Sequence, residues 1–329
     1  MRDHGGNMGL AISEFGGDPA DWIDLSTGIN ATPYPVGQVP AAAWARLPEH
    51  GSLAGLEGAA QRAYRTSLDV VAVAGAQAAI QLVPMLTPAG RAAVLTPTYN
   101  EHAAALRSGG WDVQEVAAIE ALEGYDLAVV VNPNNPDGKV YPPQTLLALS
   151  TKVGLLIVDE SFADPEPEMS LASGPQDLPG NVVILRSFGK FYGLAGVRLG
   201  FVLGVPAVAG KIRDMVGPWP VSGMAIDVCK RAFEDDAWAE QTRRQLRQDA
   251  ARLDVLATDL GWQLVGGTSL FRTYATRDAA KAQRDIATHH IWTRVFPYSD
   301  SWIRLGLPGS QGDWSRLEAA MKLSASAAT

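Results

Sequence analysis

Positive charge is in deficit in this sequence, and long apolar runs are absent. The 329 residues include 27 basic and 35 acidic side chains, which gives a formal net charge of −8. A chain without a basic surplus has no electrostatic field to attract nucleic acid or an anionic membrane surface. No apolar run approaches the roughly 20 residues that a membrane-spanning helix needs. We therefore expect neither a nucleic-acid partner nor a membrane partner.

Cysteine is also scarce, and several common kinds of site are missing. The single Cys229 cannot form an internal disulfide, and the first residues lack the charged-then-apolar order of a secretory signal, so we expect a cytoplasmic protein. The sequence has no GxSxG nucleophile elbow, no GxxxxGK[ST] phosphate loop and no histidine cluster with zinc-ligand spacing. A serine hydrolase, a P-loop enzyme and a metal site are therefore not expected.

The sequence does contain short apolar runs separated by helix-like stretches. Runs typical of strands buried on both faces occupy residues 70–74, 92–95, 127–131, 155–158 and 182–185. Helix-like stretches such as 76–85 and 101–108 lie between them. The alternation predicts βαβ units and a mostly parallel sheet, which is the α/β fold class.

The pattern changes after about residue 220. A charged helical stretch at 225–259 leads to strand candidates at 270–274 and 302–305, and the Pro- and Gly-rich residues 28–40 predict an extended arm. We expect an N-terminal arm at 1–35 that contributes to the substrate site and the small lobe, a large domain at 36–220 and a small C-terminal domain at 221–329.

A lysine in a glycine-rich loop follows the run at 182–185. Residues 187–200 read SFGKFYGLAGVRLG, with Ser187 three positions before Lys190 and Arg198 eight positions after it. Most lysines are solvated surface residues, but here a hydroxyl and a guanidinium that suit phosphate oxygens accompany the amine. Pyridoxal 5′-phosphate (PLP) needs an amine for a Schiff base, an acid at its pyridine nitrogen and a cradle for its phosphate. The segment therefore indicates PLP.

Other strand candidates end in side chains that could serve this cofactor. Asp159 follows the run at 155–158 and could hold a proton on the pyridine nitrogen, although an Asp that caps the next helix is an equally good interpretation of this residue alone. Asn135, in the segment 132–138 (NPNNPDG), could donate to the phenolic oxygen O3′, although such a segment alone is typical of a turn. Gly75 precedes a helix start, which would aim free backbone N–H groups at an anion. Tyr99 could stack on the ring or be a core aromatic.

The order of these motifs resembles that of fold-type I PLP enzymes, which share the aspartate aminotransferase fold. The nearest branch holds histidinol-phosphate aminotransferases and threonine-phosphate decarboxylases, and the resemblance runs from about residue 4 to 308. It implies a mostly parallel seven-stranded sheet in a large PLP-binding domain, a smaller α+β domain and a homodimer whose sites are each built from two chains. It implies Lys190 as the Schiff-base lysine, with Asp159 and Tyr99 as the other catalytic residues. The implied cofactor-binding residues are Ala76, Gln77, Tyr99, Asn135, Asp159, Phe162, Ser187, Lys190 and Arg198.

Segments near the two ends of the chain bear on the substrate. Residues 4–7 (HGGN) and 24–30 (DLSTGIN) resemble the opening of threonine-phosphate decarboxylases, whereas histidinol-phosphate aminotransferases share the second segment only. Residues 302–308 (WIRLGLP) resemble the family segment whose arginine binds the substrate α-carboxylate. The implied substrate-binding residues are His4, Gly28, Asn30, Asn135, Arg294 and Arg304, with His4 and Arg294 as partners of a substrate phosphate.

The sequence departs from the family pattern in two places. The family usually has a YPD-like segment and a tyrosine that reaches the cofactor phosphate of the neighbouring subunit, but residues 47–53 read LPEHGSL, so that Ser52 or His50 could substitute. Phe162 stands where many aminotransferases have a tyrosine.

The resemblance implies PLP-dependent decarboxylation of O-phospho-L-threonine to (R)-1-amino-2-propanol phosphate, a step of cobalamin biosynthesis. The alternative is an aminotransferase of the histidinol-phosphate type, which would use the same residues. A more distant alternative is a regulatory domain that binds PLP without turnover, but the acidic balance opposes DNA contact.

Overall fold

The computed structural model describes residues 4–173 and 178–326. The chain forms two compact units. The large unit consists of Tyr34–Asn135 and Lys139–Glu240, and the small unit contains the residues up to Pro33, the segment Pro136–Gly138 and the residues from Gln241 on. The chain therefore leaves the large unit for only three residues between Asn135 and Lys139.

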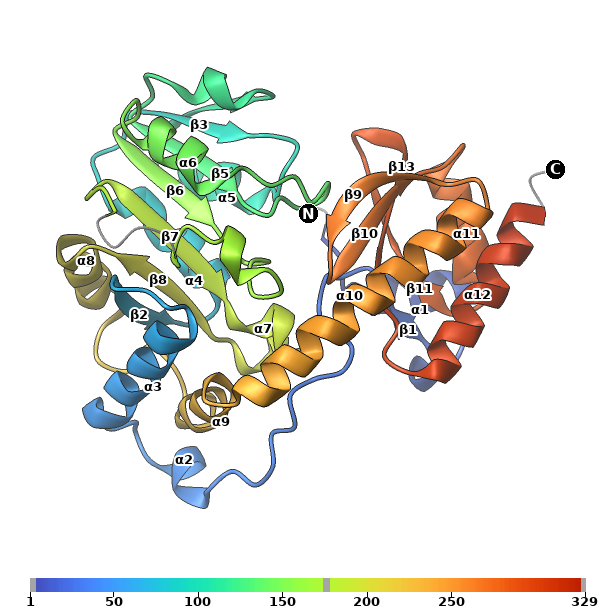
Figure 1. The fold of residues 1–329 in the computed structure, drawn as a ribbon, viewed down its shortest axis with the longest axis horizontal. Helices are drawn as coiled ribbons and strands as arrows, with labels where there is room; N and C mark the ends of the chain where they lie inside the picture. Colours follow the sequence, from blue (N-terminus) through green and yellow to red (C-terminus); the bar gives the residue numbers. More distant parts are fainter. Residues whose placement is uncertain (1–3, 174–177, 327–329) are drawn as a thin grey trace. The chain divides into compact units, whose positions relative to one another are not determined.

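A seven-stranded sheet forms the centre of the large unit (Figure 1). The strand order is β2–β8–β7–β6–β5–β3–β4, and β8 is antiparallel to both of its neighbours while the other pairs are parallel. The prediction of a mostly parallel seven-stranded sheet is confirmed. The strands are β2 (Asp69–Val73), β3 (Arg91–Leu95), β4 (Asp112–Val116), β5 (Leu127–Val131), β6 (Leu155–Asp159), β7 (Val182–Ser187) and β8 (Gly200–Gly204).

All five apolar runs predicted as strands lie in this sheet. The central strands β5, β6 and β7 are buried at every position, as expected for strands covered on both faces. Two strands were not predicted from the sequence. β4 is a mostly exposed edge strand with the polar sequence DVQEV, and β8 begins and ends in glycine, which weakens the strand pattern.

Helices precede, separate and follow the strands of the large unit. The helix predicted at 101–108 is α5 (Glu101–Ser108), and the one predicted at 76–85 is α4 (Ala76–Leu82) followed by the 3₁₀ turn η2 (Val83–Met85). The others are α2 (Ala41–Ala45), α3 (His50–Ala63), α6 (Pro143–Ser150), α7 (Phe188–Phe191), α8 (Pro206–Val216) and α9 (Gly223–Phe233), with the 3₁₀ turns η3 (Ile119–Leu122), η4 (Pro167–Met169) and η5 (Ala195–Val197). Apolar side chains of α4, α5 and α8 pack with those of the strands in one core.

The helical stretch predicted at 225–259 is confirmed, but two helices occupy it. α9 ends at Phe233, and α10 (Asp236–Asp259) begins three residues later. The Asp235 carboxylate accepts a hydrogen bond from the backbone N–H of Trp238 (3.0 Å), which is the geometry of a helix N-cap. Since α9 packs against α3, the large unit continues past residue 220.

The small unit contains an antiparallel sheet in the order β12–β13–β10–β9 and a parallel pair, β1 with β11. The strand candidates at 270–274 and 302–305 correspond to β10 and β13. The elements are α1 (Met8–Phe15), η1 (Pro19–Asp21), β1 (Ile23–Asp24), β9 (Gln263–Thr268), β10 (Phe271–Ala275), α11 (Ala279–Ala287), β11 (Ile291–Trp292), β12 (Arg294–Phe296), β13 (Ser299–Gly306) and α12 (Gln311–Ser326). Within the described ranges, no helix has the length and apolarity to cross a membrane.

Candidate active site

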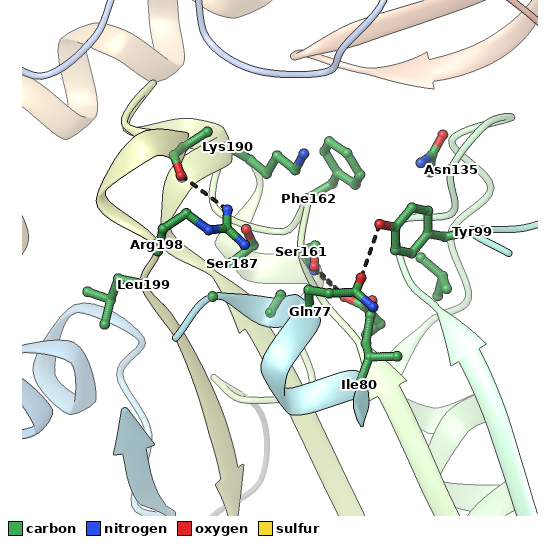
Figure 2. Close-up of a pocket in the computed structure, with 16 residues that line it drawn as sticks. Gln77, Ile80, Tyr99, Asn135, Ser161, Phe162, Ser187, Lys190, Arg198 and Leu199 are labelled. Atoms are coloured by element: carbon green, nitrogen blue, oxygen red, sulfur yellow. Dashed lines mark hydrogen bonds between the residues drawn. The ribbon is translucent and has the colours of Figure 1, made fainter. Parts of the chain in front are cut away.

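The carboxyl ends of the large unit's central strands surround one pocket. Open α/β sheets bind ligands at this edge, and the pocket is lined entirely by residues of the large unit. Every residue predicted to bind the cofactor lines it: Ala76, Gln77, Tyr99, Asn135, Asp159, Phe162, Ser187, Lys190 and Arg198. Figure 2 shows the Lys190 amine pointing toward Phe162, with Tyr99 and Asn135 across the pocket.

Asp159, the last residue of β6, is a buried carboxylate with hydrogen bonds to both oxygens. Oδ2 lies 2.8 Å from His102 Nε2, and Oδ1 accepts from the backbone N–H (2.9 Å) and the hydroxyl (2.5 Å) of Ser161. Burial alone would raise the pKa of Asp159, but the hydrogen bond and charge of His102, together with Ser161, lower it below the ordinary value. An anionic carboxylate at this position suits a protonated ring nitrogen.

His102 is a site residue that the sequence prediction missed. It lies in the first turn of α5, is 1% exposed and makes a hydrogen bond with Asp159 Oδ2. Its spacing from Tyr99 could have indicated it. His102 comes three residues after Tyr99, where the chain enters α5, and residues three apart in a helix lie on the same face. The rings of Tyr99 and His102 are 6.4 Å apart, centre to centre.

Lys190 lies in the short helix α7, directly after β7. Its Nζ atom is 5.6 Å from the centre of the Phe162 ring. The loop around it is tightly packed, because a Cβ at Gly189 would lie only 2.6 Å from Ala195 Cα. A glycine is therefore required before Lys190, and the close contact fixes the turn that carries the lysine.

A cradle for a phosphate lies at the start of α4. Gly75 has a φ of +85°, and no side chain caps the helix, so the first backbone N–H groups of α4 face the pocket. The Arg198 guanidinium lies so close that a Cβ at Gly75 would be 2.9 Å from Nη2. Ser187 lines the same pocket. Free N–H groups, a guanidinium and a hydroxyl fit the phosphate of PLP, so the residues present match the group that the lysine and carboxylate require.

Tyr99 is held by hydrogen bonds along the pocket wall. Its hydroxyl donates to Gln77 Oε1 (3.2 Å), and the Gln77 amide donates to the buried Glu101 (3.1 Å). The Tyr99 ring is thereby kept at the wall of the pocket (Figure 2).

The other predicted substrate-binding residues, apart from Asn135, belong to the small unit. Arg304 of β13 lies opposite Arg294 of β12 in the strand register. The Arg304 side chain is buried and donates to the Ser26 carbonyl oxygen (2.6 Å). Burial and the nearby charge of Arg294 lower the pKa of Arg304 to about 10. The segment 4–7 also contacts Ser26, because the Gly6 N–H donates to Ser26 Oγ (2.7 Å). His4 is exposed, whereas Gly28 and Asn30 are buried.

Comparison with known proteins identifies the family. The sequence profile of the class I and II aminotransferases matches residues 44–320. The chain belongs to the class I and II aminotransferase family. Aminotransferases of this family are PLP-dependent enzymes, so this chain is a PLP-dependent enzyme and PLP is its cofactor.

Two relatives in this aminotransferase family are similar over nearly their full length. A threonine-phosphate decarboxylase from Sinorhizobium is 42% identical over 94% of this chain and 95% of that protein, and one from Pseudomonas aeruginosa is 41% identical over 98% and 97%. Among solved structures, a histidinol-phosphate aminotransferase from Sinorhizobium meliloti in complex with PLP has a TM-score of 0.78 at 18% identity, covering 93% of this chain and 91% of its own. At that identity the structural match shows the fold alone, and it confirms the aspartate aminotransferase-like class.

Proposed function

We propose that the chain decarboxylates O-phospho-L-threonine to carbon dioxide and (R)-1-amino-2-propanol phosphate, as a step of cobalamin biosynthesis. The observation that carries this proposal is the 41–42% identity, over nearly the whole chain, to two proteins named threonine-phosphate decarboxylase. In the reaction the bond from Cα to the carboxylate carbon breaks, and a proton takes the place of the carboxylate.

The large unit supplies the groups that act on the cofactor and on Cα. When bound, PLP provides an electron sink for the electron pair that remains at Cα. Asp159, an anion at neutral pH, holds the proton on the ring nitrogen. Lys190 anchors the cofactor and afterwards delivers a proton to Cα. Ser187, Arg198 and the start of α4 bind the cofactor phosphate, and Asn135 donates to O3′.

The small unit supplies positive charge for the substrate's two anionic groups. Arg304 binds the α-carboxylate in a forked contact, Arg294 with His4 binds the phosphate, and Gly28 and Asn30 also contact the substrate. The paired positions of Arg294 and Arg304 on adjacent strands support this assignment. The like charges repel each other, and a bound anion would relieve that repulsion.

We also propose that the protein is a cytoplasmic homodimer in which the large unit is the PLP-binding domain and the N-terminal arm belongs with the small domain. Large apolar side chains of the large unit support the dimer, because Trp44 and Leu47 are each 66% exposed and Trp219 is 55% exposed. Such exposed side chains are common at protein interfaces.

Purified holoenzyme given O-phospho-L-threonine tests the reaction. We expect stoichiometric release of carbon dioxide and aminopropanol phosphate, with the cofactor still in its pyridoxal form. The parallel experiment gives the holoenzyme histidinol phosphate and then 2-oxoglutarate. A transaminase would convert the cofactor to pyridoxamine phosphate in the first half-reaction, with histidinol phosphate. If the cofactor is converted to pyridoxamine phosphate and phosphothreonine releases no carbon dioxide, the chain is an aminotransferase instead.

A further inference from the structure

Three consecutive residues next to Asn135 rest on the sheet of the small unit. The hydroxyl of Thr273, in β10, is fully buried and donates to the Pro136 carbonyl oxygen (2.5 Å). Gly266, the partner of Thr273 across β9 and β10, comes so near that a Cβ there would lie 2.1 Å from the Asp137 carbonyl oxygen. A Cβ at Gly138 would lie 2.2 Å from the Gly267 carbonyl oxygen.

The residues before Asn135 are held in the large unit. The Asn134 amide donates to the Pro97 carbonyl oxygen (2.9 Å), and its side-chain oxygen accepts from the Thr98 hydroxyl (2.6 Å), next to Tyr99. The base of the loop is closed by Asn132, whose side chain exchanges two hydrogen bonds with the backbone of Tyr141 (2.7 and 3.1 Å).

Asn135 therefore stands where the chain passes from one unit to the other. Its predecessor is fixed by large-unit contacts and its successor by small-unit contacts. Consecutive Cα atoms are separated by a fixed distance of about 3.8 Å, so a shift of Pro136 must move or rotate Asn135. Neither anchor alone determines where the Asn135 amide lies.

We infer that Thr273, Gly266 and Gly267 are positioning residues, which set the place of the Asn135 amide against O3′ of PLP. This inference rests on the proposed function, in which Asn135 donates to O3′. A donor there stabilises the ionised oxygen, and its loss raises the pH at which the visible absorbance of the lysine-bound cofactor titrates. Moving the donor away from O3′ should raise this titration midpoint as well, but by less than losing the donor does.

The test is a pH titration of the visible spectrum of holoenzyme variants. Asn135→Ala should raise the titration midpoint by about one pH unit. Thr273→Val, which keeps the side-chain shape but removes the hydroxyl, should raise it by roughly half as much, and Thr273→Ser should restore the wild-type midpoint. Gly266→Ala reaches the loop through a different residue, because its methyl group would displace Asp137, and should also move the midpoint.

Thr276→Val is the matched control. It also removes a threonine hydroxyl that donates to a backbone carbonyl, that of Ser301 (3.3 Å), but it lies outside the contacts with residues 136–138. Its midpoint should equal that of the wild type. Thermal unfolding of each variant shows which of them fold.

The outcomes separate the inference from the proposed function. If Asn135→Ala leaves the midpoint unchanged, the proposed role of Asn135 fails. If Asn135→Ala shifts the midpoint but folded Thr273→Val and Gly266→Ala holoenzymes do not, the positioning inference is overturned, and lower melting temperatures alone would mark a structural role. Should one of these two variants fail to fold, the other decides.

Discussion

The large and small units hold their candidate site residues in opposite electrostatic states. In the large unit, the buried Asp159 carboxylate is compensated on both oxygens, by His102 and by Ser161. In the small unit, two guanidinium groups occupy paired positions on adjacent strands, and burial with like charge lowers the pKa of Arg304 to about 10. A permanent cofactor suits the first arrangement, because the site is preorganised before substrate arrives. A substrate that comes and goes suits the second, because each binding event relieves repulsion.

The largest effect should come from the large unit, at Lys190. Lys190→Ala removes the amine that anchors the cofactor and moves the proton, and positioned proton transfer alone contributes roughly 10²–10⁴-fold to a rate. We expect decarboxylation to fall at least that far and the visible absorbance of the lysine-bound cofactor to disappear. Lys152→Ala, at an exposed lysine paired with Glu123, should change neither. Unchanged absorbance and turnover in Lys190→Ala would remove the basis of the proposed function.

The compensation of Asp159 can be broken at His102. His102→Leu removes the partner of Asp159 Oδ2, while Ser161 still binds Oδ1. Breaking a buried pair costs about 3–5 kcal/mol. His102→Gln keeps a donor and should cost less. Neither leucine nor glutamine has a titratable side chain, so the difference in unfolding free energy between the two variants reports on Asp159.

The pH dependence of that difference has a definite sign. A carboxyl whose pKa is lower in the folded protein stabilises the fold above its unfolded pKa of about 3.9, and the contribution is lost as the pH falls through the folded value. In His102→Leu the raising effect of burial is no longer offset by residue 102, so the Asp159 contribution weakens or reverses at neutral pH. Urea unfolding should therefore show His102→Leu less stable than His102→Gln at pH 7, with the gap narrowing below about pH 4. An equal gap at both pH values would argue against this account.

The features of the molecule also differ in how far they could be predicted from sequence. Asp159 ends a buried strand of the sheet, and Lys190 and Asn135 follow two others. Parallel strands end at one edge, so the meeting of these residues follows from the fold class. His102 is inside a helix and carries no motif of its own. Thr273 contacts Pro136 across more than 130 positions of chain, and no local pattern reports such a contact. The break between α9 and α10 was missed because the helical pattern of 225–259 is continuous across Asp235.

The smallest of these effects is expected at Arg304, where a matched arginine on the neighbouring strand isolates substrate binding from structure. Arg272 makes a forked ion pair with Asp254 (Nε to Oδ1 2.9 Å, Nη2 to Oδ2 2.7 Å), whereas Arg304 donates to a backbone carbonyl. Lysine keeps the charge but not the fork. Arg304→Lys should raise KM for phosphothreonine about 10–100-fold, the size of one charged hydrogen bond, with little change in unfolding free energy. Arg272→Lys should lower the unfolding free energy by about 1–2 kcal/mol and leave KM near wild type. The reverse pattern would mean that Arg272, in its partly buried ion pair with Asp254, recognises the substrate, and that Arg304 does not.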